Sequence, residues 1–175
     1  MTMNITESIA TFPEYAKDIR LNYSKVLNEN TLNKQQLYGI ILISSLTTQN
    51  NHLIELALEE IKNYLDENYI EDVYGAFAIM TMNSIYYRFT HLSTEYDYSS
   101  IPANLRMQYL TKHKIEKQDF EALCLAVAAL LGCGKCINAH EATLRVGGMS
   151  TQSIQSVVRI AAIINAIANL LKVRK

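Results

Sequence analysis

The chain has few of the residues that interrupt helices. Only two prolines and six glycines occur among its 175 residues, of which 49% are hydrophobic and 19% are charged. A globular composition with so few breakers favours long helices over many short strands. The length predicts a single domain, residues 1–175, that is large enough to bury a proper core.

The chain also lacks an excess of either charge. Its 16 basic residues nearly balance its 17 acidic residues. No basic stripe of the kind that binds nucleic acid results from this balance. We therefore expect no nucleic-acid partner.

Signals for a membrane or for export are missing as well. Residues 1–11 contain no charged segment followed by an apolar run, which a signal peptide would have. The longest apolar stretch, residues 160–171, is shorter than a membrane span and contains Asn165 and Asn169. We expect a soluble, cytoplasmic protein with no membrane partner.

What the chain does have is helical periodicity. No segment alternates over a strand length, so the prediction is an all-α fold, a single helical bundle. Pro13 is expected at the first position of the first helix, and Gln118-Asp119 as the cap of a central apolar helix. Residues 90–103 are predicted as an ordered loop. The helices expected are about eight, near residues 13–27, 34–47, 53–65, 70–89, 104–112, 120–131, 133–145 and 151–172.

The two halves of the sequence follow the same order. An apolar helix, a polar break, an amphipathic helix and a second apolar helix describe residues 37–88, and again residues 120–172. The polar break at residues 48–51 occupies the place that residues 133–136 occupy later. The pattern suggests an internal helical duplication in which only the second copy contains chemically reactive residues.

That chemistry is indicated by a close pair of cysteines, Cys133 and Cys136, with His140 four residues further on. At i, i+3 and i+7 the three side chains share one face of a helix. Thiol chemistry needs a thiolate, which the positive end of a helix and a nearby imidazole both favour. Cys136 and His140 are the closest pair, so Cys136 is the predicted activated thiol and Cys133 its partner.

The cysteine pair has other interpretations. Two unreactive cysteines that happen to lie close is the simplest of them. A zinc site lacks a second cysteine pair, and Cys133 and His140 would be roughly 10 Å apart along the helix axis. Covalent haem needs a histidine directly after the second cysteine, where Ile137 stands. We expect no metal.

Further residues have both a plain and a functional interpretation. Glu121 is a first-turn carboxylate that complements the helix dipole, unless it reaches His140 and orients the ring. Lys135 either lowers a thiol pKa or is simply solvated. Cys124 is expected to be buried and inert. Three histidines without partners at useful spacing are expected at the surface or in loops: His52, His91 and His113.

The chemistry-bearing residues belong to a longer pattern. The pattern resembles the alkyl hydroperoxidase D (AhpD) family of the carboxymuconolactone-decarboxylase-like superfamily, and it spans nearly the whole chain. The matching pieces are residues 13–22, Ala78-Ile79-Met80, Met82-Asn83, Tyr87-Arg88, Leu105-Arg106-Met107, Phe120-Glu121, Gly132-Cys133, Cys136, Ala139-His140-Glu141, Thr143-Leu144-Arg145 and Ala161-Ala162-Ile163.

The resemblance implies an all-helical, usually trimeric antioxidant enzyme with no bound cofactor. Such proteins act as thiol-dependent peroxidases and reduce a partner peroxiredoxin. Their electrons come from dihydrolipoamide on a lipoylated acyltransferase subunit, which lipoamide dehydrogenase keeps reduced. The resemblance also implies roles: Cys136 attacks and forms the sulfenic acid, Cys133 supplies a proton and closes the disulfide, and His140 with Glu121 relays protons.

One residue departs from the family pattern. Lys135 stands directly before the second cysteine, where family members have a histidine. A lysine stabilises a thiolate electrostatically but is a poor proton shuttle near neutral pH. Two alternatives of other kinds remain: a decarboxylase-type or lactone-type enzyme of the same superfamily, and a non-catalytic helical interaction module.

Overall fold

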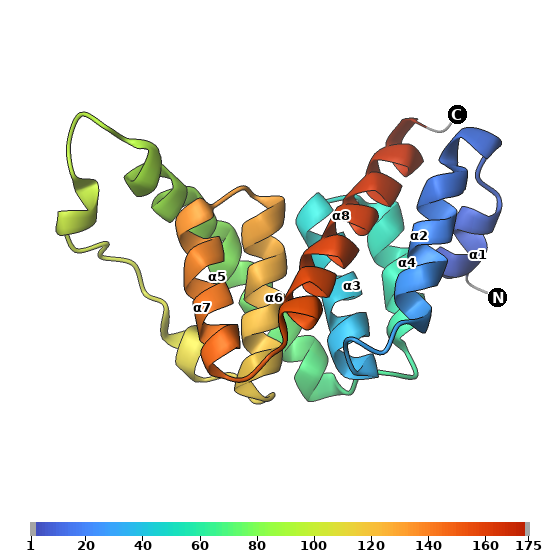
Figure 1. The fold of residues 1–175 in the computed structure, drawn as a ribbon, viewed down its shortest axis with the longest axis horizontal. Helices are drawn as coiled ribbons and strands as arrows, with labels where there is room; N and C mark the ends of the chain where they lie inside the picture. Colours follow the sequence, from blue (N-terminus) through green and yellow to red (C-terminus); the bar gives the residue numbers. More distant parts are fainter. Residues whose placement is uncertain (1–2, 174–175) are drawn as a thin grey trace.

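A computed structural model of the chain describes residues 3–173 and shows a helical bundle (Figure 1). No strand occurs within these residues, which confirms the all-α prediction. The α-helices are α1 (Ile5–Ala10), α2 (Lys17–Asn28), α3 (Lys34–Thr48), α4 (Asn51–Ile61), α5 (Glu67–Leu92), α6 (Lys117–Leu130), α7 (Gly134–Val146) and α8 (Thr151–Val173). Three short 3-10 helices join them: η1 (Glu14–Ala16), η2 (Tyr98–Ser100) and η3 (Gln108–Thr111).

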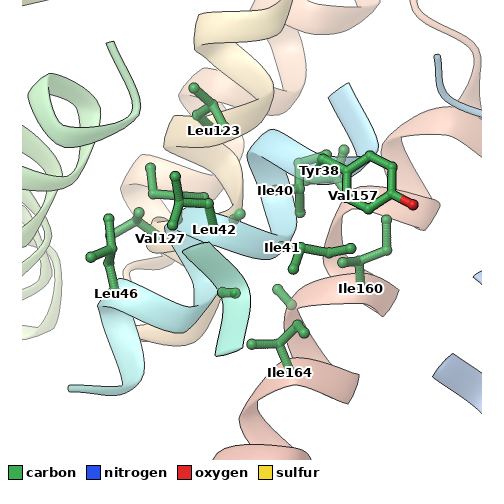
Figure 2. Packing of buried hydrophobic residues seen from close by; sticks show 14 of the residues in the cluster. Tyr38, Ile40, Ile41, Leu42, Leu46, Leu123, Val127, Val157, Ile160 and Ile164 are labelled. Carbon is green, nitrogen blue, oxygen red and sulfur yellow. The ribbon is translucent and has the colours of Figure 1, made fainter. Parts of the chain in front are cut away.

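Helices α3 and α6 form the centre of the bundle, as their nearly continuous apolar sequences predicted. They pack against each other, and each also packs against α5 and α8. Figure 2 shows Leu42 of α3 beside Val127 of α6, and Ile41 of α3 beside Ile160 of α8. Each fully buried aliphatic side chain of this kind stabilises the fold by about 1.5–3 kcal/mol.

The packing has the pairing that an internal duplication would produce. If α3, α4 and α5 correspond to α6, α7 and α8, then α3 packs on α8 as α6 packs on α5. The corner between α3 and α4 also matches the corner between α6 and α7. Gln49 and Gly132 both have left-handed backbone, with φ of 54° and 68°. The next residue, Asn50 or Cys133, caps the following helix by accepting a hydrogen bond from the backbone N–H three residues ahead.

The N-terminal part of the chain differs from its prediction. Pro13 does not begin an α-helix, because its carbonyl oxygen accepts from Ala16 N–H at 3.0 Å and closes the 3-10 turn η1 first. Helix α1 was not predicted at all. Its signal was present in the sequence as a capping box, in which the Asn4 side chain caps Glu7 N–H and the Glu7 side chain caps Asn4 N–H.

The predicted cap of α6 is also wrong. The N-cap is Glu116, which makes no side-chain capping bond. Asp119 lies inside the first turn, where its carboxylate accepts hydrogen bonds from Gln36 Nε2 at 2.8 Å and from Tyr69 OH at 3.4 Å. Gln118 donates to the carbonyl oxygen of Gly147. Contacts with other helices have therefore taken both side chains away from the capping role.

The loop after α5 runs outward from the body of the bundle before it returns (Figure 1). Helix α5 continues to Leu92, and only η3 forms within the helix expected at residues 104–112, because Asn104 has left-handed backbone with φ of 53°. The returning segment is anchored by the fully buried Asp72. This carboxylate accepts from Tyr109 OH at 2.9 Å, Lys114 N–H at 2.5 Å and Ile115 N–H at 2.7 Å.

Helix α8 closes the bundle. It is long and apolar enough to cross a membrane by length and composition alone, and it is longer than the apolar stretch 160–171 suggested. One face of the helix, which includes Val157, Ile160 and Ile164, is buried inside the bundle, where α8 packs against α3 and α6. It begins at Thr151, as the predicted range 151–172 requires. Before it, Gly148 turns the chain with φ of 90°, and Ser150 Oγ accepts from Ser153 N–H at 3.0 Å.

Candidate active site

The predicted cysteine pair forms a disulfide at the start of α7, with 5.2 Å between the two Cα atoms. The local sequence explains this position. Gly132 takes the left-handed conformation that ends α6, so that Cys133 becomes the N-cap of α7. Cys136 lies in the first turn, and its N–H donates to Cys133 Sγ at 3.2 Å. Both sulfurs therefore lie at the positive end of the helix.

The two cysteines differ in access. Cys133 is completely buried, whereas Cys136 is 5% exposed and lines a pocket of about 410 Å³. The pocket is mostly apolar, because its walls include Met80, Tyr87 and Met107. A small molecule that enters it meets the sulfur of Cys136 and not that of Cys133.

His140 lines the same pocket, one turn along α7 from Cys136. Its Nδ1 atom lies 2.7 Å from Glu121 Oε2, and the side chains are only 14% and 18% exposed. The close packing of α6 on α7 brings Glu121 into contact with the histidine from 19 residues away. This contact is the one that a functional role for Glu121 requires. With Nδ1 bonded to the carboxylate, Nε2 is the ring nitrogen available to a group in the pocket.

Lys135 lies at the rim of the pocket, where it is exposed. Its Nζ atom is 5.4 Å from the centroid of the Tyr87 ring, in the range of a cation–π contact. It also borders a second cavity of about 460 Å³, together with His91 and Asp97. Hydrogen bonds from Ser99 hold the pKa of Asp97 below its usual range, and the charge of Lys135 acts in the same direction.

The remaining predicted residues have plain structural roles. Cys124 is fully buried in α6, and this burial raises the pKa of its thiol well above the ordinary value. His52 and His91 are exposed, as expected. His113 lies in the loop before α6, also as expected, and is only partly exposed because its ring stacks on Phe120 with 4.4 Å between centroids. Within residues 3–173, no group of three or more His, Cys, Asp and Glu side chains could hold a metal ion.

Asn83 is a pocket residue that was not among the predicted site residues. It comes from α5, is 4% exposed and lines the pocket beside Cys136. Its backbone carbonyl oxygen lies 4.0 Å from Cys136 Sγ. Its sequence signals were its place in the Met82-Asn83 piece of the family pattern and its polarity among the apolar residues of a core helix.

The chain is similar in sequence to known proteins. The sequence profile of the Carboxymuconolactone decarboxylase family matches residues 97–175. An alkyl hydroperoxide reductase AhpD of Coxiella burnetii is 45% identical over 161 residues, which cover 90% of this chain and 91% of the relative. The protein of the same name from Acidobacterium capsulatum is 43% identical, over 99% of this chain and 95% of the relative. A third, from Solibacter usitatus, is 40% identical, over 98% and 97%.

Proposed function

Because the chain belongs to the AhpD family of alkyl hydroperoxide reductases, we propose that it is a peroxide-reducing enzyme whose Cys133–Cys136 pair alternates between dithiol and disulfide. The observation that supports this proposal most directly is the difference in access between the sulfurs. Cys136 lines an apolar pocket while Cys133 is buried behind it. One sulfur is thus arranged to meet the substrate and the other to resolve the product.

The proposed reaction has two steps. The Cys136 thiolate attacks the terminal oxygen of R–O–OH, so that an S–O bond forms, the O–O bond breaks and RO⁻ leaves to become the alcohol. Sulfur is oxidised by two electrons to the sulfenic acid. Cys133 sulfur then attacks the sulfur of Cys136, which forms the disulfide and releases water. An external dithiol returns the pair to the reduced state.

His140 and Glu121 are proposed to move the protons. The imidazole, one turn from Cys136, takes up the thiol proton and delivers a proton to the leaving alkoxide. The carboxylate of Glu121, 2.7 Å from Nδ1, holds the ring in place and stabilises its charged form. Lys135 adds a positive charge beside the thiolate without acting as a proton shuttle.

The electron donor and the partners are part of the same proposal. We assign the donor as dihydrolipoamide on a lipoylated acyltransferase, recycled by lipoamide dehydrogenase in the cytoplasm, and the acceptor partner as a peroxiredoxin. A pocket of about 410 Å³ suits a slender dithiol arm, which can extend into it as far as the Cys136 sulfur.

A homotrimer is proposed as the assembly. Apolar side chains are exposed along the outer part of α5, where Ile85, Phe89 and Leu92 are 54%, 50% and 67% exposed. A contiguous apolar surface of this kind favours association between protein chains. Sedimentation of the purified protein tests this assignment, and a monomer at micromolar concentration would contradict it.

The test of the reaction uses three serine variants. Cys136→Ser is expected to abolish turnover with dihydrolipoamide and a peroxide, whereas Cys124→Ser retains it. Cys133→Ser keeps the attacking thiol and should trap a mixed disulfide with the protein partner. Loss of two thiols per chain on treatment with hydrogen peroxide separates this function from a decarboxylase-type enzyme or an interaction module. Equal activity of the Cys136 and Cys124 variants would overturn the proposal.

A further inference from the structure

The geometry points to a further catalytic residue for this reaction: we propose that the side-chain amide of Asn83 binds the O–H group of the hydroperoxide beside Cys136. The inference rests on the proposed function and deepens it. It assigns a polar contact at the substrate end of a pocket whose walls are otherwise mainly apolar.

The position of Asn83 is the first argument. The residue lines the pocket together with Cys136, and its own carbonyl oxygen lies 4.0 Å from the Cys136 sulfur. Helix α5 packs against both α6 and α7, so this backbone is held firmly against the start of the dithiol helix. A peroxide oxygen in contact with Cys136 is therefore within the neighbourhood of the Asn83 side chain.

The second argument is an unused hydrogen-bond acceptor. Asn83 is 4% exposed, and its Oδ1 atom has no hydrogen-bond partner among residues 3–173. An amide oxygen that is buried without a partner destabilises the folded state. The buried amide of Asn50 differs: its Oδ1 accepts from Leu53 N–H at 3.1 Å and its Nδ2 donates to Ala168 O at 2.8 Å.

The chemistry of the substrate supplies the missing partner. Asn83 Oδ1 is almost inaccessible in this structure, so the amide first turns its oxygen toward the pocket. The terminal oxygen of R–O–OH bears one hydrogen, which Oδ1 then accepts while the R group lies against the apolar wall of Met80 and Met107. The Cys136 thiolate attacks that same oxygen. Its hydrogen stays on it when the S–O bond forms and RO⁻ departs, so the amide continues to accept from the S–O–H group of the sulfenic acid. Asn83 thus keeps one hydrogen bond through the whole step.

The experiment compares two buried polar residues that are neighbours in α5. Asn83→Leu removes the amide and keeps the volume. Ser84→Ala is the matched control, since Ser84 is fully buried and its Oγ atom also has no partner within residues 3–173, but it does not line the pocket. The two half-reactions are measured separately, as oxidation of the reduced protein by peroxide and as reduction of the disulfide by dihydrolipoamide.

We expect Asn83→Leu to slow oxidation by about 10-fold, the effect of one hydrogen bond formed at the reacting group. The loss should be the same for hydrogen peroxide and for tert-butyl hydroperoxide, because both have the O–H group. Reduction by dihydrolipoamide should stay within about 2-fold of wild type, and the melting temperature should be equal or higher. Ser84→Ala should leave both half-reactions unchanged.

Other outcomes would overturn the assignment. Unchanged oxidation in Asn83→Leu excludes the amide from the reaction, and an equal fall in both half-reactions makes the residue merely structural. Asn83→Ala, checked by circular dichroism, repeats the measurement if the leucine variant does not fold. The proposed function fails in a different way, namely if the wild-type protein loses no thiols to peroxide.

Discussion

The contact between Glu121 and His140 gives the sharpest prediction for the mechanism. Glu121→Gln keeps a side chain of the same size and a neutral acceptor for His140 Nδ1, but it removes the negative charge. The two atoms are 2.7 Å apart and both side chains are more than four-fifths buried, so solvent screens the interaction only weakly. We therefore expect the loss to be visible in the rate of Cys136 oxidation.

The size of the effect follows from the type of bond. A hydrogen bond to a charged group contributes about 1.5–3 kcal/mol, and every 1.4 kcal/mol is about a factor of 10 in rate if it is expressed in the transition state. Glutamine retains part of the bond, so about a 10-fold loss is expected for Glu121→Gln. Glu121→Ala, which also frees the ring to rotate, should lose up to about 100-fold.

The assay is a stopped-flow measurement of peroxide reduction by the reduced protein, at several pH values. Glu141→Gln is the matched control, because Glu141 follows His140 directly but is 41% exposed and pairs only with Arg145 at 3.4 Å. The control should behave like wild type. If Glu121→Gln and Glu141→Gln have the same rates while His140→Ala is slow, the carboxylate has no part in proton transfer and the reasoning is refuted.

Three further predictions concern buried groups. Burial raises the pKa of the Cys124 thiol, so iodoacetamide should leave Cys124 unlabelled in the native reduced protein and label it after denaturation; labelling of Cys124 in the native state would contradict this. Burial also raises the pKa of the Asp119 carboxyl, so the folded state holds that proton more tightly than the unfolded state, and the stability from this group is lost as pH rises through the folded pKa. The melting temperature of Asp119→Asn should therefore fall less between pH 4 and 7 than that of wild type. Parallel plots of melting temperature against pH would refute the assignment. Asp72→Ala breaks three hydrogen bonds of a fully buried carboxylate and should lower the free energy of unfolding in urea by about 3 kcal/mol or more. Its neighbour Glu71→Ala, an exposed partner of Lys114, should lose less than about 1 kcal/mol, and equal losses would show that Asp72 does not anchor the loop.

The positions of most helices, and the residues that share a helix face, could be predicted from the sequence. The spacing of Cys133, Cys136 and His140 indicates a common helix face, and α7 begins where that spacing requires. Contacts between side chains of different helices were harder to predict from the sequence. The sequence pattern alone favoured a plain role for Glu121 as a first-turn carboxylate, and the family resemblance implied a role with His140. The packing of α6 on α7 brings the two side chains into contact.

The errors have the same physical origin. Asp119 has the residue type and position of a helix cap, but Gln36 and Tyr69 from other helices claim its carboxylate. Asn83 is 53 residues from Cys136, and a single asparagine in a core helix does not indicate which side chain it will face. Such pairings depend on the relative rotation of helices, which hydrophobic periodicity does not determine.

The matching corners of the two halves have a consequence for how the protein is recognised. Asn50 caps α4 with an amide in the position where Cys133 caps α7 with sulfur, so this corner does not depend on a covalent bond for its shape. When the disulfide opens, the Cys133 sulfur can still accept from Cys136 N–H. The oxidised and reduced proteins should then present nearly the same outline to their surroundings. A donor or acceptor protein would have to distinguish the oxidised from the reduced protein by the reactivity of one sulfur atom and not by a change in the shape of the surface.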